Sequence, residues 1–283
     1  MSTRIGLYED ALVYDVLHAS GTRAEIGVVE RLARRRGALA AEERGVFLEP
    51  ACGTGRYLRA LAKRGHSVIG FDREAEMVAF AQEAMEAPAR ASRGPHARGT
   101  RGARGTHDLF VSDMTTFARR VPAASVDVAF NLINTIRHLG SDRAMLAHFT
   151  AVARVLRPRG VYVVGLSLTD YGNEFETEDV WSGSRAGLRV QQVVQYLPAS
   201  RRLRREWVHS HLTVTLGGPA GREEHRDSKY WLRGYSREEW LGLIGKSALK
   251  LLGAADAAGR RREIGVSGYA LYVLGRRIGA EWG

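Results

Sequence analysis

The apolar and polar residues of this 283-residue chain follow two different patterns, and residue 168 separates them. Before it, short apolar runs alternate with segments whose apolar positions recur every three or four residues. Buried strands covered by helices have this pattern, which predicts an α/β fold with a doubly wound, mostly parallel seven-stranded sheet and helices on both faces. We expect the strands at residues 46–48, 66–72, 108–113, 125–132, 160–168, 248–254 and 268–276.

The helical segments have recognisable ends. Ser141 precedes one apolar pattern as a cap, and Ser236 begins a Ser-x-x-Glu capping box before another. The two helices closest to the N-terminus are expected to form a helical lid within residues 1–40. The predicted helices cover residues 8–19, 22–36, 55–64, 74–87, 141–156 and 236–246.

Beyond residue 168 the apolar positions alternate with period two. Residues 188–198, 203–216 and 225–236 therefore predict an antiparallel meander rather than a further βαβ unit. We interpret residues 171–234 as an antiparallel, substrate-side insertion after the fifth strand. The chain has no internal repeat and no evident linker, so residues 1–283 are expected to form one domain.

The net charge of +11 raises the question of a nucleic-acid partner. Arginine supplies 38 of the 42 basic residues, and residues 88–107 carry five of them with no acid. The remaining +6 is unremarkable for a chain of this size. Because the 88–107 segment has no aromatic residue for base stacking, we interpret it as a flexible Arg/Gly-rich loop, and nucleic-acid binding is disfavoured.

Location and metal binding are constrained by what the sequence lacks. No apolar run approaches the roughly 20 residues of a membrane helix, and the N-terminus has acids inside its apolar pattern. Cys52 is the single cysteine, which excludes an internal disulfide. His209 and His211 lack an evident third ligand, so we predict no metal site. A cytoplasmic protein without a membrane partner is expected, and its oligomeric state is open.

The stretch GVFLEPACGTGRYLRAL, residues 45–61, carries the strongest chemical signal. Gly53 and Gly55 allow a ligand to approach the backbone closely, and the following helix directs its free N–H groups to the same place. A dinucleotide site would have a third glycine where Leu58 stands, and no P-loop lysine follows. Since the carboxylate of Glu49 repels phosphate and attracts ammonium, we expect a nucleoside that bears a cationic group.

Polar residues also end the next three predicted strands. Asp72 lies 19 residues after Gly53, where an acid binds ribose hydroxyls. Asp113 is suited to an exocyclic amine and Met114 to packing against a base. Asn131 ends the fourth strand. The carboxyl ends of parallel strands share one edge of the sheet, so these residues predict a single ligand crevice.

Five motifs in order resemble those of the class I, Rossmann-like S-adenosylmethionine-dependent methyltransferases of small-molecule type. They are LEPACGTGR, GFD, SDM, VAFNLINTIRHL and VLRPRGVYVV, within residues 45–168. The resemblance implies S-adenosyl-L-methionine as cofactor. It assigns the methionine part to Glu49, Ala51, Gly53 and Gly55, the ribose to Asp72, the adenine to Asp113 and Met114, and the methyl-transfer site to Asn131.

Two further residues complete this interpretation of the cofactor site, and Ala51 departs from the family pattern. Tyr14, in the predicted lid, and Arg73, beside Asp72, are included among the cofactor-binding residues. Ala51 stands where the family usually has glycine, and we expect it to have a negative φ.

The resemblance implies methyl transfer by in-line displacement to a nitrogen or oxygen of a small-molecule acceptor. His138 and Asn134 are the candidate catalytic residues; a backbone-bonded, structural His138 is an equal alternative. Arg137 could bind a substrate carboxylate or lie in solvent. Two other functions stay open: an RNA or protein methyltransferase that uses the 88–107 loop, and a non-catalytic cofactor-binding module. A DNA adenine methyltransferase is disfavoured because NLIN replaces its Asn-Pro-Pro-Tyr motif.

Overall fold

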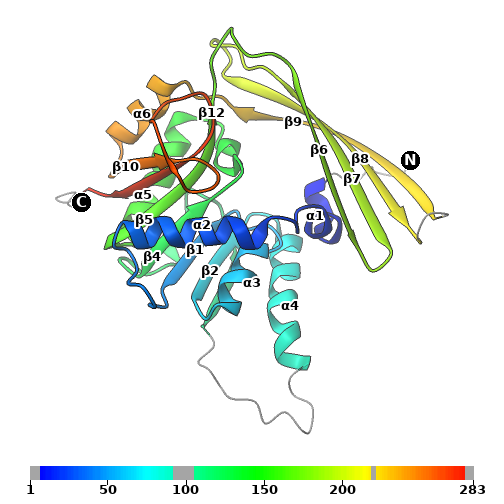
Figure 1. Cartoon of the computed structure of the whole chain (residues 1–283), viewed down its shortest axis with the longest axis horizontal. Coiled ribbons are helices and arrows are strands. Elements are labelled where there is room, and N and C mark those ends of the chain that lie inside the picture. Colours follow the sequence, from blue (N-terminus) through cyan, green and yellow to red (C-terminus); the bar gives the residue numbers. More distant parts are fainter. Residues whose placement is uncertain (1–6, 92–104, 218–220, 278–283) are drawn as a thin grey trace.

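The computed structural model describes residues 7–91, 105–217 and 221–277, which contain two β-sheets (Figure 1). The first sheet has eight strands in the order β11-β10-β12-β5-β4-β1-β2-β3. Strands β1 to β5 pair in parallel, and β12, β10 and β11 continue the sheet antiparallel. The strands are β1 Val46–Pro50, β2 Ser67–Asp72, β3 His107–Val111, β4 Val126–Asn131, β5 Leu156–Leu168, β10 Leu249–Ala255, β11 Arg261–Arg262 and β12 Gly268–Arg276.

The predicted α/β class and the mostly parallel sheet are confirmed. The count differs by one, because the two-residue β11 pairs with the end of β10 and extends the seven expected strands to eight. A strand of two residues has no periodicity that a sequence pattern could reveal.

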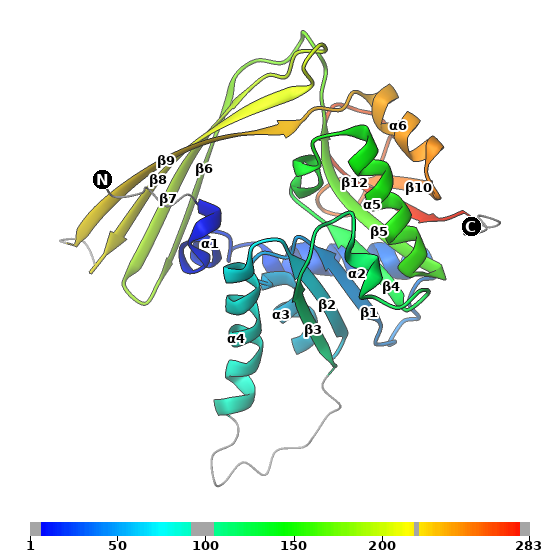
Figure 2. The same ribbon diagram turned by 180° about the vertical axis from the view of Figure 1, so that it is seen from behind.

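Helices cover both faces of this sheet, as the two opposite views show (Figures 1 and 2). Apolar residues of α2, α3 and α4 pack with the sheet in one core, and those of α5, α6 and η2 pack in the other. The helical segments are η1 Leu7–Glu9, α1 Ala11–Leu17, α2 Thr22–Arg35, α3 Arg56–Lys63, α4 Ala75–Ala91, η2 Phe117–Arg119, η3 Thr135–His138, α5 Asp142–Val155 and α6 Arg237–Lys246.

The N-terminal segment is divided more finely than its apolar pattern predicted. Asp10 accepts a hydrogen bond from the Val13 amide and starts α1 there, so the expected helix 8–19 becomes η1 and a seven-residue α1. Helix α2 lies on the sheet with its apolar face buried, whereas α1 packs against the second sheet. Only η1 and α1 therefore have the position expected of a lid.

The second sheet is antiparallel and lies between β5 and α6 in the chain, as predicted. Its four strands are β6 Thr177–Arg185, β7 Leu188–Leu197, β8 Arg205–Leu216 and β9 Arg222–Arg233. The expectation of three strands was wrong. Strand β6 is a polar edge strand whose residues are nearly all exposed, and it lacks the apolar alternation that marks a half-buried strand. Both views place α1 between this sheet and the larger one.

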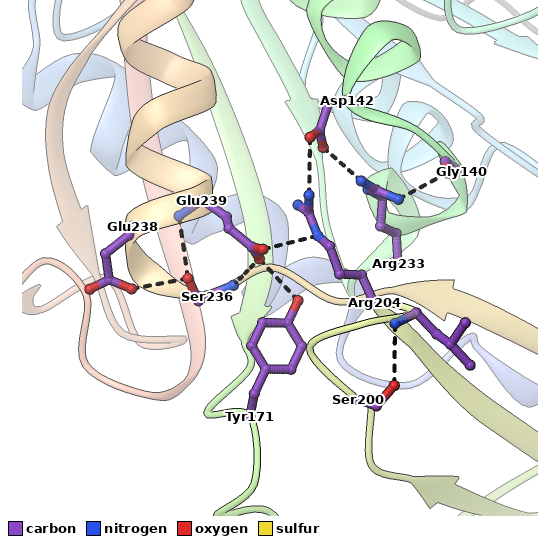
Figure 3. A network of polar contacts seen from close by, with 10 residues as sticks. Gly140, Asp142, Tyr171, Ser200, Arg204, Arg233, Ser236, Glu238 and Glu239 are labelled. Carbon is purple, nitrogen blue, oxygen red and sulfur yellow. Dashed lines mark hydrogen bonds and ion pairs between the residues drawn. The ribbon is translucent and has the colours of Figure 1, made fainter.

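A network of charged side chains fixes the second sheet to the first (Figure 3). The carboxylate of Asp142, at the start of α5, accepts hydrogen bonds from Arg204 (3.0 Å) and Arg233 (2.9 Å), which lie just before β8 and at the end of β9. Arg204 also forms an ion pair of 3.1 Å with Glu239 of α6, which accepts a hydrogen bond from the Tyr171 hydroxyl. The two chain segments that join the sheets, from β5 to β6 and from β9 to α6, are thus held by the same network.

The Arg/Gly-rich segment predicted at residues 88–107 is described only at its ends. Helix α4 continues to Ala91, four residues beyond the predicted end, and β3 begins at His107. Residues 92–104 lie outside the described residues, so the flexible loop stays a prediction.

Candidate active site

The glycine loop between β1 and α3 bends through three left-handed residues. Ala51, Gly53 and Gly55 have φ values of 52°, 51° and 70°. The turn is closed by hydrogen bonds from the Cys52 amide to the Phe71 carbonyl and from the Gly55 amide to the Cys52 carbonyl, both 2.9 Å. The expected negative φ at Ala51 was wrong, because this bend requires the left-handed conformation there as well. The methyl group of Ala51 makes that conformation cost about 1–2 kcal/mol.

Asp72, at the end of β2, holds the loop in place. Its Oδ2 accepts a hydrogen bond of 2.8 Å from the Gly53 amide, and its Oδ1 accepts one of 3.0 Å from the Glu74 amide. Burial raises the pKa of this carboxyl despite both bonds. Asp72 therefore joins the glycine loop to the start of α4, at the position expected for a ribose-binding acid.

Glu49 and Asn131 present buried acceptors that lack donors. Glu49 is 5% exposed, and its Oε2 has no hydrogen-bond partner among the described residues. Burial raises its pKa well above the usual value. The Nδ2 of Asn131 donates to the Pro50 carbonyl (2.8 Å), but its Oδ1 is also buried without a partner in the described chain. Since buried acceptors are almost always satisfied, these two atoms indicate a ligand with several N–H donors.

A small recess surrounds these atoms. Tyr14 of α1 covers it: a Cβ added to Gly53 would lie 3.2 Å from Tyr14 Cε1. Arg56, which sequence reasoning missed, contributes a buried guanidinium held by Glu25 (3.0 Å). Its signal was the cation directly after the second glycine in GTGR. The recess is lined by Tyr14, Glu49, Ala51, Cys52, Arg56, Tyr57, Asn131, Leu132, Ile133 and Thr135.

The residues predicted for the adenine end lie at the carboxyl ends of β2 and β3, which are paired neighbours. Asp113 is exposed, and its Oδ1 accepts hydrogen bonds from the amide (2.7 Å) and hydroxyl (2.6 Å) of Thr115. Met114 packs against the core under α5. Arg73 is exposed and pairs with Glu74 at 2.8 Å. The fold thus brings these residues to the sheet edge that also carries Glu49.

After β4 the chain turns through two consecutive left-handed residues, Ile133 (φ 46°) and Asn134 (φ 63°). A β-branched residue rarely adopts this conformation, so the turn is strained and must be held by its neighbours. The Ile133 amide donates to the Tyr269 hydroxyl at 3.1 Å. Asn134 accepts from the Ser167 amide (2.7 Å) and donates to its hydroxyl (3.1 Å). These bonds give Asn134 an orienting position at the start of η3.

His138, at the end of η3, lies between aromatic rings from two other elements. Its ring centroid is 5.7 Å from that of Tyr8 and 5.8 Å from that of Tyr230, in β9. The ring is exposed to solvent but enclosed on these sides. Desolvation, together with the positive charges of Arg73 and Arg137, lowers the pKa of His138 to about 4. Its imidazole is therefore neutral near pH 7, and one ring nitrogen can accept a hydrogen bond.

Arg137 is neither in solvent nor free. It is 2% exposed, its Nε donates to the Arg233 carbonyl at 2.8 Å, and its Nη2 forms a 2.9 Å ion pair with Glu206 of β8. Burial raises the pKa of Glu206. The pair ties η3 to the second sheet beside His138.

The described part of the chain offers neither a metal-binding cluster nor a membrane-spanning helix. Among residues 7–91, 105–217 and 221–277, no group of three or more His, Cys, Asp or Glu side chains is arranged to hold a metal ion. None of the helices in these ranges is long and apolar enough to cross a bilayer.

Comparison with known proteins agrees with this geometry. Residues 47–160 match a family model described as a methyltransferase domain. A search of curated protein sequences gave no significant match. Similar solved structures include an S-adenosylmethionine-dependent methyltransferase from Clostridium acetobutylicum ATCC 824, with 13% identity, a TM-score of 0.68, and coverage of 94% of this chain and 97% of that chain.

Two further structures share the fold. The sugar N-methyltransferase KedS8 from Streptoalloteichus sp ATCC 53650 has 19% identity and a TM-score of 0.66, covering 94% of this chain and 92% of that chain. CalS10, an amino pentose methyltransferase from Micromonospora echinaspora, has 21% identity and a TM-score of 0.60, covering 89% and 92%.

Residues 47–160 thus match a methyltransferase domain, and the chain as a whole shares the fold of class I, Rossmann-like S-adenosylmethionine-dependent methyltransferases. The resemblance drawn from its five motifs is confirmed. The protein is a methyl-transferring enzyme, and S-adenosylmethionine is the cofactor of the enzymes whose fold it shares. The unpartnered oxygens of Glu49 and Asn131 fit the cofactor's ammonium group.

Proposed function

We propose that this enzyme methylates a nitrogen or oxygen of a small-molecule acceptor at the carboxyl edge of the larger sheet. The observation that carries the proposal is the buried, unpartnered carboxylate of Glu49 beside a left-handed glycine bend. When bound, S-adenosylmethionine supplies a methyl group on an electrophilic sulfonium. The protein must therefore bind, orient and exclude water rather than activate the methyl donor.

The recess offers complementary charges for the two ends of an amino acid. Glu49 and Asn131 would accept hydrogen bonds from its ammonium group, and Arg56 would face its carboxylate. Beyond the recess, Asp72 would bind the ribose, and Asp113 with Met114 would bind the adenine. Tyr14 and Arg73 would complete the walls. Gly53 and Gly55 leave room for the ligand because they have no side chain.

The acceptor would lie near His138, between Tyr8 and Tyr230, where η1 and the second sheet cover the sheet edge. This covering favours a small molecule over a polymer. KedS8 and CalS10 are described as acting on a sugar nitrogen and an amino pentose, so amino sugars are the first acceptors to test. The neutral imidazole of His138 would accept a hydrogen bond from the acceptor's N–H or O–H group and so orient it toward the methyl group.

Calorimetry with S-adenosylmethionine and S-adenosylhomocysteine tests the cofactor part. We expect Glu49→Gln to weaken binding of the amine-bearing cofactor about 100-fold, because a charge-assisted hydrogen bond is lost and a donor faces the ammonium. Glu42→Gln, an exposed substitution before β1, should bind as the native enzyme does. Native-like binding by Glu49→Gln would contradict the proposed site.

Mass spectrometry tests the acceptor. Amino sugars and their hydroxyl counterparts should be incubated with the enzyme and cofactor, and products that gain one methyl group identify the acceptor atom. A folded enzyme that binds the cofactor and methylates no member of either set would favour the non-catalytic alternative.

A further inference from the structure

Arg56 lines a second, larger cavity besides the recess at Glu49. This cavity, about 470 Å³ in volume, is lined by residues from the end of α1, the start of α2, one face of α3 and the end of β6. Five of its lining side chains are cationic and a single one is a carboxylate. The cations are Arg23, Arg56, Arg59, Lys63 and Arg185, and the carboxylate is Asp15. We name it the basic cavity.

The charges of the basic cavity do not balance. Asp15 is shared by Arg59 (2.5 Å) and Arg185 (2.7 Å), and Arg56 pairs with Glu25 just outside the lining. Arg23 and Lys63 form no ion pair within the described residues. Five cations thus face two carboxylates. Like charges that converge in a concave site destabilise the fold unless an anion neutralises them.

The backbone adds to this positive field. Helix α2 is fourteen residues long, and its N-cap is Gly21, which has no side chain to bond the first amides. The amides of Thr22 and Arg23 therefore lie at the positive end of the α2 dipole, at the edge of the basic cavity. The helix dipole and the cationic side chains therefore both favour an anionic ligand.

We propose that the basic cavity binds a phosphate or diphosphate group. Arginine guanidinium groups hold phosphate oxygens with paired hydrogen bonds, and a volume of this size suits a small molecule rather than a polymer. The bound group would connect Arg185, at the end of β6, to α2 and α3, and so join the second sheet to the larger one. This inference does not depend on the proposed methyl acceptor.

Titration calorimetry with inorganic pyrophosphate, at constant ionic strength, tests the site. We expect the native enzyme to bind it and the double variant Arg23→Ala/Lys63→Ala to bind it at least about tenfold more weakly. Both side chains are exposed and unpaired in the described chain, so the fold should be retained. The matched control is Arg119→Ala/Lys250→Ala, which removes the same two charges outside the cavity and should not change the affinity.

Several outcomes would overturn the proposal. Absence of pyrophosphate binding by the native enzyme is one, and an equal loss in the control variant is another, because it would indicate general attraction to a basic protein. Displacement of pyrophosphate by saturating S-adenosylhomocysteine would place it in the cofactor site instead. Unchanged S-adenosylhomocysteine binding by Arg23→Ala/Lys63→Ala would show that the variant is folded.

The same probe identifies where the phosphate comes from. If it belongs to the acceptor, pyrophosphate should inhibit methyl transfer in competition with that acceptor. If it is a free anion, pyrophosphate should leave the acceptor KM unchanged. In either case, pyrophosphate binding that needs Arg23 and Lys63 supports the site.

Discussion

Glu49 is a buried carboxyl group whose surroundings do not satisfy it in the unliganded protein. Neighbouring Asp72 raises its pKa further, and Arg56 lowers it only in part. The residue therefore costs the fold some stability, which a bound cationic group would restore. Such local conflicts are typical of functional sites.

The stability of the unliganded protein should reveal this conflict. The pKa of Glu49 is higher in the folded than in the unfolded state, so its stabilising contribution is full below the unfolded value of about 4.5 and is lost as the pH rises. Glu49→Gln has no such loss. The difference in unfolding free energy should therefore grow in favour of Glu49→Gln by up to about 1.4 kcal/mol per pH unit, measured by urea unfolding between pH 5 and 8.

A constant difference between the two proteins across this pH range would contradict the raised pKa. Glu42→Gln, measured in parallel, should follow the native enzyme at every pH.

His138 makes a second prediction at this scale. His138→Gln should lower kcat by about 10²-fold while cofactor affinity stays unchanged, because it disturbs a group that orients the acceptor and not a cofactor contact. Since the pKa of His138 is about 4, the native rate should show no inflection from this residue near pH 6.5. His211→Gln, on the exposed surface of β8, is the control. If His138→Gln keeps full activity, the role of His138 is structural and not catalytic.

A buried carboxylate, Asp15, adds ion pairs to the apolar packing that holds α1 over the glycine loop. Asp15 is 2% exposed and bonds Arg59 of α3 and Arg185 of β6, and Arg59 also donates to the Thr54 carbonyl (2.5 Å). On the other side of α1, Val16 touches β6 so closely that a Cβ at Gly183 would lie 2.1 Å from its carbonyl oxygen. A short helix thus has its position fixed by the elements on both sides.

Asp15→Asn should release α1 without unfolding the protein. The substitution leaves Arg59, which is partly buried, and Arg185, which is exposed, without their counter-charge, at a cost of about 1–3 kcal/mol. Hydrogen exchange of residues 11–17 should become at least about tenfold faster, and exchange in β4 and β5 should not change. Glu178→Gln, an exposed substitution in β6, should leave exchange in α1 as it is in the native protein. If α1 exchanges as slowly in Asp15→Asn as in the native protein, the ion pairs of Asp15 do not hold this helix.

The elements that sequence patterns predicted are those with one clear periodicity. Strand β4 and residues 160–166 of β5 are mostly apolar because both faces are buried there, and Ser236 with Glu239 forms the expected capping box. Strand β6 was missed because an exposed edge strand needs no apolar face. Helix α1 begins after Asp10 because the Asp10 side chain caps it. The spacing of apolar residues, from which the longer helix was predicted, does not show such a cap.

Across the whole molecule, the second sheet depends on a few contacts with the larger one. Asp142 forms ion pairs with Arg204 and Arg233, and Arg204 forms a second one with Glu239. The two chain segments that join the sheets therefore meet in the same ionic network (Figure 3). The pairs couple the position of β8 and β9 to the starts of α5 and α6.

Asp142→Asn should loosen this connection. Asp142 is partly exposed, so we expect a loss of about 1 kcal/mol, which corresponds to a fall in Tm of about 2–4 °C by calorimetry. The arginines lower the pKa of Asp142, and the native advantage should therefore disappear as the pH falls below the range where its carboxyl ionises. Asp108→Asn, on exposed β3, should melt at the native temperature.

The sequence predicts which residues meet at the sheet edge wherever each one lies at the end of a parallel strand. Glu49, Asp72 and Asn131 lie at the carboxyl ends of β1, β2 and β4, which are neighbours in the sheet, so parallel pairing brings them together. Tyr230 could not be assigned in this way, because its place beside His138 depends on how the second sheet folds over the first. Ala51 was misjudged for a related reason: its φ is set by closure of the loop, which residue preference does not determine.

The ring of Tyr14 above Gly53 has a consequence for the speed of catalysis. A cofactor seated under that ring would enter or leave when α1 moves, and α1 is held both by the ion pairs of Asp15 and by apolar packing on the second sheet. The lifetime of these contacts would then limit how often the enzyme completes a cycle.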